Sequence, residues 1–197
     1  MTSTRPRLSS ARPWRARTFI ATSIDGFISR EDGDIDWLTD PPAEPRHVAG
    51  HDGPTPPAAY DEFTAAVSHL VMGRGTYEKV ASFTGWPYDR FRVVVLSTTL
   101  DASVDDRISV VRSLDDAVTT LDSHGATDVY VDGGAVVSAF LDADLLDELY
   151  LHRAPIVLGR GLPLFHQLDR EIRLIHLGTS TNDAGMTSSR YGVARPS

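Results

Sequence analysis

The chain has 197 residues, of which 41% are apolar and 23% are charged, so one globular domain is expected. Its formal net charge of −8 argues against nucleic-acid binding, which needs a basic surface, and the absence of cysteine excludes disulfides, thiolate metal sites and cysteine nucleophiles. No segment has the roughly 18 consecutive apolar residues of a membrane helix, so a membrane is not expected among the partners either. We expect a cytoplasmic protein.

The first residues look different from the rest of the chain. Arginines recur among prolines and serines up to Arg17, and no apolar stretch typical of a secretory signal follows them. We therefore predict a disordered tail over residues 1–16 and a single domain over residues 17–197.

The domain is predicted to begin with a strand. The apolar run from Thr18 to Ile24 precedes an Asp25-Gly26 turn signal. Residues 29–57 hold six prolines and three glycines, too many for regular structure. A loop of this length in a compact domain is usually functional or disordered.

Helices and strands alternate after this loop. Pro57 can open a helix, whose apolar face repeats from Phe63 to Leu70. Leu70–Met72 is short and apolar, which predicts a buried strand that ends at Gly73. A further helix is expected from about Thr76 to Phe83.

The next elements have the clearest signals in the chain. Val93–Leu96 is a β-branched run, as in a strand that is covered on both faces. Ser113 and Asp116 form a capping box at the start of a helix, and Gly125 stands at its C′ position.

The remaining elements complete the predicted fold. They are the strand Val129–Val131, the helix Ala135–Leu141, the strand Leu145–Leu151 and two closing strands, Ile172–Leu177 and Met186–Val193, that are candidates for a hairpin. Alternating strands and helices predict a three-layer α/β fold with a mostly parallel central sheet, helices on both faces and antiparallel C-terminal strands.

Three strand ends carry residues suited to phosphate. Gly73 and Gly75 let a ligand approach the backbone, and Arg74 between them offers a guanidinium fork. Gly133-Gly134 precedes a helix whose N-terminus can bind a pyrophosphate, and Ser97-Thr98-Thr99 offers hydroxyls. Each segment alone is equally compatible with an ordinary turn. Together they suit a dinucleotide, which crosses several adjacent strand ends.

These segments also carry a resemblance. Residues 72–78 (MGRGTYE), 93–100 (VVVLSTTL), 129–134 (VYVDGG) and 155–165 (PIVLGRGLPLF), in this order, resemble the dihydrofolate-reductase-like superfamily. The most similar branch contains the reductase domain of the riboflavin-biosynthesis deaminase-reductase, and residues 23–28 (SIDGFI) also match it.

The resemblance implies an NADPH site. Relatives often have an arginine after the serine of the Ser97 segment, where this chain has Thr98, so its preference between NADPH and NADH stays open. The cofactor-binding residues that the resemblance implies are Gly73, Arg74, Thr76, Ser97, Thr98, Asp132, Gly133, Gly134 and Ala135.

The resemblance also bears on the substrate. Dihydrofolate reductases have an acid that would fall at about Pro57 or Ala58, neither of which is charged, so folate reduction is disfavoured. Asp25 and Trp37 become the catalytic candidates, although Asp25 is equally a turn residue and Trp37 equally a lid anchor. Tyr60 and Phe63 are the predicted substrate-binding residues. His47 and His51 alone do not make a metal site.

We therefore expect an NADPH-dependent oxidoreductase that reduces a small pteridine-like, pyrimidine-like or carbonyl substrate. A non-catalytic protein that binds a nucleotide or pterin on the same fold is the main alternative. An unrelated α/β protein with coincidental turns is the other. Since members of the riboflavin branch often pair, a homodimer is possible.

Overall fold

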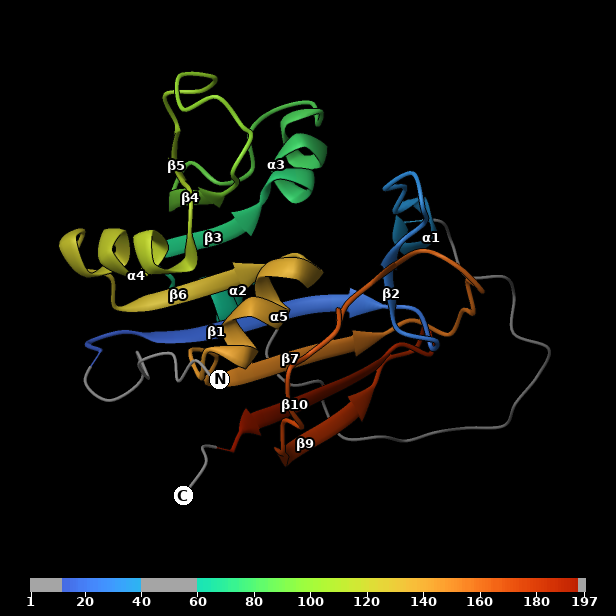
Figure 1. Cartoon of the computed structure of the whole chain (residues 1–197). Coiled ribbons are helices and arrows are strands. Elements are labelled where there is room, and N and C mark those ends of the chain that lie inside the picture. Colours follow the sequence, from blue (N-terminus) through green and yellow to red (C-terminus); the bar gives the residue numbers. More distant parts are fainter. Residues whose placement is uncertain (1–11, 40–59, 195–197) are drawn as a thin grey trace.

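The computed structural model describes residues 12–39 and 60–194, which form an eight-stranded sheet and a small two-stranded one (Figure 1). The strands of the large sheet are β1 (Arg15–Thr22), β3 (His69–Gly73), β4 (Arg92–Leu96), β5 (Ile108–Val111), β6 (Asp128–Asp132), β7 (Glu148–Arg153), β9 (Leu174–Thr181) and β10 (Thr187–Val193). The small sheet pairs β2 (Phe27–Ser29) with β8 (Leu162–Pro163). The helices are α1 (Asp36–Thr39), α2 (Tyr60–Thr64), α3 (Arg74–Ala81), α4 (Leu114–Ser123) and α5 (Gly134–Asp142).

The large sheet has the order β5-β4-β3-β6-β1-β7-β10-β9. It is parallel from β5 to β7, and β10 lies antiparallel between β7 and β9, with which it forms the predicted C-terminal hairpin. The predicted mostly parallel sheet with antiparallel closing strands is confirmed.

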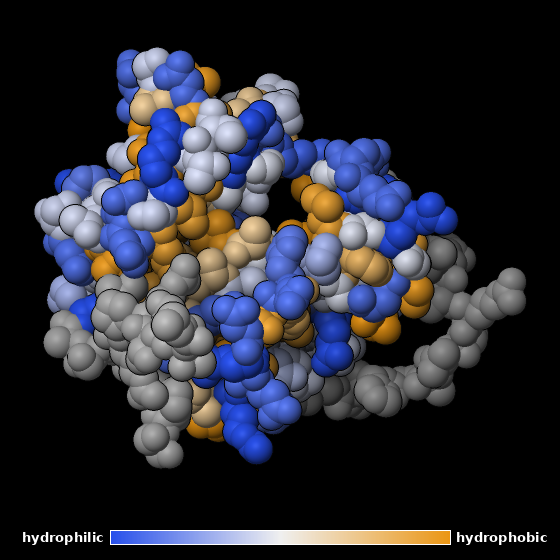
Figure 2. Space-filling model, in the orientation of Figure 1, coloured by the Kyte–Doolittle hydropathy of each residue, from blue (hydrophilic) through white to orange (hydrophobic). Residues whose placement is uncertain are grey.

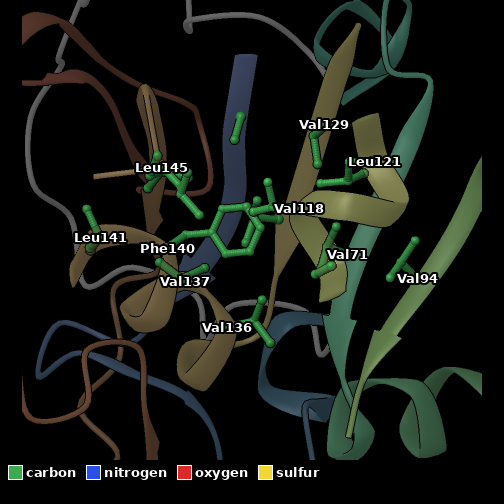
Figure 3. Packing of buried hydrophobic residues seen from close by; sticks show 14 of the residues in the cluster. Val71, Val94, Val118, Leu121, Val129, Val136, Val137, Phe140, Leu141 and Leu145 are labelled. Carbon is green, nitrogen blue, oxygen red and sulfur yellow. The ribbon is translucent and has the colours of Figure 1, made fainter. Parts of the chain in front are cut away.

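Two apolar clusters cover the two faces of this sheet. On one face, α4 and α5 pack over Val71 and its neighbours, with the fully buried Phe140 at the centre (Figure 3). On the other face, α2 and α3 contribute Phe63 and Tyr77, which pack near Leu70 and Met72. Successive residues of β3 thus enter opposite clusters, which is why its sequence is apolar without interruption. The predicted helices on both faces are confirmed.

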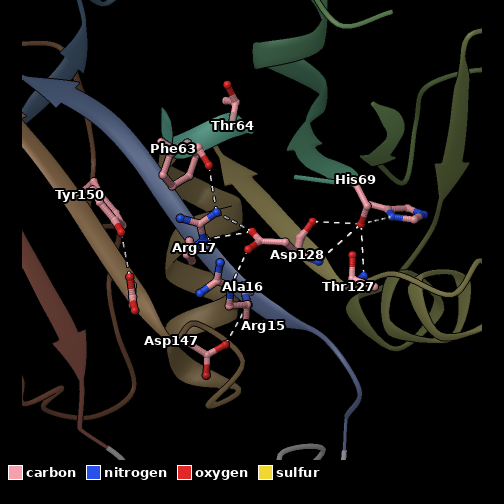
Figure 4. Close-up of polar contacts among 12 residues, drawn as sticks. Arg15, Ala16, Arg17, Phe63, Thr64, His69, Thr127, Asp128, Asp147 and Tyr150 are labelled. Atoms are coloured by element: carbon pink, nitrogen blue, oxygen red, sulfur yellow. Dashed lines mark hydrogen bonds and ion pairs between the residues drawn. The ribbon is translucent and has the colours of Figure 1, made fainter. Parts of the chain in front are cut away.

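The first strand begins earlier than predicted. β1 starts at Arg15, and Trp14 before it is only 3% exposed. Arg17 is buried, and its guanidinium donates to the Asp128 carboxylate (2.8 Å) and to the carbonyl of Phe63 (2.9 Å) (Figure 4). Residues 12–16 therefore belong to the fold, which corrects the boundary of the predicted tail, while residues 1–11 lie outside the described part.

Other boundaries differ for tertiary reasons. α2 ends at Thr64, and Leu70 lies in β3, where pairing with β4 and β6 outweighs the helical spacing. β7 begins at Glu148, because Leu145 and Leu146 pack into the core before the strand starts. The edge strand β5 was not predicted at all.

The N-cap serine of α4 and the glycine at its C′ position are confirmed. The Asp116 backbone N–H donates to the Ser113 hydroxyl (3.1 Å), and Gly125 has a φ of +66°. Within residues 12–39 and 60–194, no helix is long and apolar enough to cross a lipid bilayer.

Candidate functional site

The three predicted strand ends lie side by side at one edge of the sheet. β3 is the neighbour of both β4 and β6, and the register places Gly73 opposite Leu96 and Met72 opposite Asp132. The carboxyl ends of β3, β6 and β1 point toward the space between α3 and the segment of β2 and α1 in Figure 1. Figure 2 shows a surface hollow there, with hydrophobic atoms on its walls. Ligands of parallel sheets bind at such edges.

The glycine pair after β6 is required by packing inside the protein. Gly133 has a φ of +87°, and a Cβ atom there would overlap the hydroxyl of Thr76. A Cβ atom on Gly134 would overlap the carbonyl oxygens of Pro163 and Leu164. The pair therefore has a structural role, and the close approach also brings the predicted residues Thr76 and Gly133 together.

Two helices begin at this edge without a side-chain cap among the described residues. The N-caps of α3 and α5 are Gly73 and Gly133, whereas the N-cap of α4 is a serine that accepts a hydrogen bond. The first N–H groups of α3 and α5, including that of Ala135 in α5, carry the positive ends of the helix dipoles. Such helix starts are suited to bind phosphate.

Arg74 links this helix start to the segment after β4. Its guanidinium donates to the Thr99 hydroxyl (2.9 Å) and to the Glu78 carboxylate (2.6 Å), and its side chain is half exposed. An arginine at this position can reach an anion at the mouth of the hollow. Glu78 offsets part of its charge.

The polar groups of Ser97 are partly engaged in hydrogen bonds within the turn that follows β4. The Ser97 hydroxyl accepts hydrogen bonds from the backbone N–H groups of Thr99 (3.2 Å) and Leu100 (3.0 Å), and its carbonyl accepts one from Arg112 (2.8 Å). Ser97 is buried and Thr98 is exposed. Turn capping thus accounts for the serine by itself, and only its hydroxyl proton remains for a ligand.

The carboxyl group of Asp132, the last residue of β6, has a raised pKa. Its Oδ1 accepts a hydrogen bond from the Gly133 N–H (2.8 Å), but withdrawal from water outweighs this bond and raises the pKa of Asp132 to about 6. Burial first, and then the charge of Asp132, raise the pKa of Tyr60, Tyr88 and Tyr130. The carboxyl group therefore lies near three phenol rings and can hold a proton near neutral pH.

Asp25, the predicted catalytic acid, lies in a different environment. Its exposed carboxylate accepts hydrogen bonds from the backbone N–H groups of Leu158 (3.1 Å) and Gly159 (2.7 Å). The Ser23 hydroxyl first, and then these N–H groups, lower the pKa of Asp25. An ionised carboxylate that fixes a loop is poorly suited to donate a proton, so the geometry favours the turn-residue alternative.

The other predicted catalytic and substrate-binding residues differ in how far their side chains are exposed to solvent. Trp37 of α1 is 7% exposed, which is compatible with the lid-anchor alternative, and its indole N–H has no hydrogen-bond partner among the described residues. Tyr60 is 39% exposed and lies edge-on to Phe19, at 5.4 Å between ring centroids. Phe63 is 1% exposed and packs beneath them, with its ring centroid 5.1 Å from that of Phe19. Phe63 thus lies inside an aromatic cluster, and its burial argues against the predicted direct contact with substrate.

Other parts of the molecule carry fewer groups suited to bind a ligand or a metal ion. A pocket lined by Arg92, Arg107 and His124 lies at the amino ends of β4 and β5, opposite the glycine turns. No group of three potential metal ligands occurs in the described ranges, and His47 and His51 lie outside them. Sequence reasoning missed a buried pair, His152 and Ser188, whose signal was a histidine directly after the apolar run Leu149–Leu151.

The strand order, with its antiparallel C-terminal hairpin, is that of the dihydrofolate-reductase-like α/β fold. The resemblance seen in the sequence is confirmed by a match to a family model. Residues 17–187 match the model of the RibD C-terminal domain, and the chain belongs to this family. It is 34% identical over 164 residues to the protein YwjB of Bacillus subtilis (strain 168), a match that covers 82% of this chain and 88% of YwjB.

Two solved structures extend the comparison. A protein of Shewanella sp. PV-4 assigned to riboflavin biosynthesis shares 33% identity with a TM-score of 0.76, over 92% of this chain and 99% of that chain. The dihydrofolate reductase of Enterococcus faecalis, in complex with NADP(H), shares 17% identity with a TM-score of 0.61, over 92% and 97%. The second likeness concerns the fold alone.

Proposed function

We propose that the chain is an NADPH-dependent reductase of a small heterocyclic or carbonyl substrate. The observation that carries this proposal is the meeting of two uncapped helix starts and the Arg74 guanidinium at one edge of a parallel sheet. The family of the chain and the shared fold with a reductase that binds NADP(H) support it.

The described residues fit such a cofactor. The N–H groups at the starts of α3 and α5 would hold phosphates, with Arg74 at their side and the Ser97 segment next to them. Thr76 and Gly133 would form the floor between the two helices. When bound, NADPH supplies the hydride, and the protein contributes orientation and exclusion of water.

Asp132, which the resemblance placed among the cofactor-binding residues, is instead our candidate for the proton donor. Reduction of a C=N or C=O bond needs a hydride on carbon and a proton on the heteroatom. With its pKa raised to about 6 by burial, the Asp132 carboxyl is protonated in about a tenth of molecules at pH 7, and it can regain its proton from water. Asp25, by contrast, would hold the 158–159 loop in place.

The test is a titration followed by a turnover assay. Binding of NADPH and NADH is followed by fluorescence, and oxidation of bound NADPH is then recorded with pyrimidine, pteridine and carbonyl compounds. We expect micromolar binding and turnover of at least one class. Tight binding without any turnover would favour the non-catalytic alternative, and failure to bind either nucleotide at millimolar concentration would overturn the proposal.

A further inference from the structure

A buried histidine and serine form a pair on the face of the sheet that α2 covers. His152 of β7 is 6% exposed, and its Nδ1 lies 2.7 Å from the hydroxyl of Ser188 in β10. The register continues this row on both sides, with Ala21 of β1 opposite His152 and Ser180 of β9 opposite Ser188. The row lies toward the carboxyl end of β1 and β7, the same edge as the glycine turns.

Two polar atoms in this row have unused hydrogen-bonding capacity. The Nε2 of His152 and the hydroxyl of Ser180 are buried and have no hydrogen-bond partner in the described part of the chain. Buried polar atoms are almost always paired, so such an atom at a ligand edge calls for a partner. Burial lowers the pKa of His152 to about 4, so its ring is neutral at pH 7 and offers a single donor or acceptor at Nε2.

Aromatic side chains connect the pair with the proposed active site. The ring of Phe19 lies 4.0 Å from the imidazole of His152 and 5.4 Å from the ring of Tyr60, between centroids. Tyr60 in turn lies close enough to Asp132 for the charge of that residue to raise its pKa. Phe19 and Ala21 are only half-buried. An apolar strip thus runs from the proposed proton donor to the histidine.

We propose that His152 is a substrate-binding residue whose Nε2 hydrogen-bonds a ring carbonyl or ring nitrogen of a flat heterocycle lying against Phe19 and Tyr60, and that Ser188 positions the imidazole. This inference rests on the proposed function and narrows its substrate to a flat heterocycle with a polar edge.

The chain contains a matched control at the opposite end of the sheet. His69 of β3 is 2% exposed, its Nδ1 lies 2.9 Å from the Ser68 hydroxyl, and its Nε2 is also buried without a partner among the described residues. Burial, with the nearby charge of His124, lowers its pKa to about 4 as well. His69 thus has the same chemistry but lies at the amino end of its strand.

The test uses 5,6-diaminouracil as the probe and the intact chain as the protein. Affinity is measured by calorimetry, with and without NADPH, for wild type, His152→Gln, Ser188→Ala and His69→Gln. We expect His152→Gln to weaken probe binding about tenfold, because a buried hydrogen bond is lost, and Ser188→Ala to weaken it a few-fold. His69→Gln should bind the probe like wild type. Affinity for NADPH, titrated separately, should change less than about twofold in all three variants.

A spectroscopic readout distinguishes contact with the probe from a merely structural role. In 15N-edited spectra of the histidine side chains, the probe should shift the Nε2 resonance of His152 and leave that of His69 unchanged. A water molecule as the permanent partner of Nε2 would leave both resonances unchanged, and this would overturn the inference.

Two further results would also contradict it, namely unchanged affinity in Ser188→Ala and His152→Gln, or no binding of the probe at millimolar concentration. If the chain bound the probe through His152 but bound neither NADPH nor NADH, the reductase proposal would be contradicted. The heterocycle-binding site would still be supported.

Discussion

The hydroxyl of Thr76, at the start of α3, fills the space that a Cβ atom on Gly133, after β6, would occupy. This contact joins two of the three strand ends that the sequence marked as phosphate-binding segments. The shape of the surface on which the cofactor is proposed to lie therefore depends on the absence of a side chain at Gly133. Gly133 is therefore constrained twice, by its φ of +87° and by its neighbour.

Alanine variants at Gly133 and Gly159 distinguish the cost of backbone strain from the cost of overlap with Thr76. We expect Gly133→Ala to lower the free energy of unfolding by about 2–4 kcal/mol, from left-handed strain plus overpacking. Gly159→Ala is the matched control, because Gly159 has a φ of +76° but no atom within 4 Å of its added Cβ, so strain of about 1–2 kcal/mol is expected there. Urea unfolding measures both.

A double variant tests the contact itself. Thr76→Ala removes the hydroxyl that the added Cβ would overlap, so Gly133→Ala should be less damaging in the Thr76→Ala background. Additive effects in this cycle would show that the overlap does not govern the loss of stability.

Arg17 and Asp128 form the buried ion pair at the amino end of the sheet, where both side chains are less than a tenth exposed. Arg17→Met should lower the free energy of unfolding by about 1.5–3 kcal/mol, because the buried Asp128 carboxylate loses one of its two arginine partners, while Arg15 still pairs with its other oxygen. The control is Arg30→Met, which breaks the exposed pair with Asp34 and should change stability by less than about 1 kcal/mol. Equal effects in the two variants would contradict the buried-pair argument.

The strand ends could be predicted from sequence because glycine, arginine and hydroxyl residues follow apolar runs in a parallel arrangement. The roles of single residues could not, because they depend on tertiary partners. Asp25 is held by the N–H groups of Leu158 and Gly159, and Phe63 is covered by other rings, neither of which periodicity reveals. Likewise, the pairing of His152 with Ser188 exists only once β10 lies beside β7.

Arg74 should matter for the nucleotide more than for stability. Arg74→Ala is expected to raise the Kd for NADPH about five- to tenfold, because a charge-assisted contact to phosphate is lost. The dependence of Kd on salt concentration should also become weaker. Arg107→Ala serves as the control, since Arg107 is exposed, pairs with Asp105 and lies before the amino end of β5. An unchanged Kd in Arg74→Ala would remove Arg74 from the proposed site.

The contributions of Asp132 and Asp25 to the free energy of unfolding should change with pH in opposite directions. The folded pKa of Asp132, about 6, lies above the ordinary pKa of an aspartate, about 3.9, so its favourable contribution to stability is present below pH 4 and is lost as pH rises through 6. Asp132→Asn should therefore gain stability relative to wild type between pH 4 and 7, by at most about 3 kcal/mol. Asp25 has a lowered pKa, so its stabilisation is present above pH 4, and Asp25→Asn should lose stability at neutral pH.

The same substitution tests the proton donor. If Asp132 protonates the substrate, Asp132→Asn should reduce kcat about 100-fold or more and leave the Kd for NADPH within about twofold. The wild-type rate should fall as pH rises above 6, because the donor loses its proton, and this dependence should disappear in the variant. Asp25→Asn should keep the wild-type pH profile, since its carboxylate is ionised throughout this range. A rate for Asp132→Asn within threefold of wild type would exclude Asp132 as the donor and return the search to the tyrosines around it.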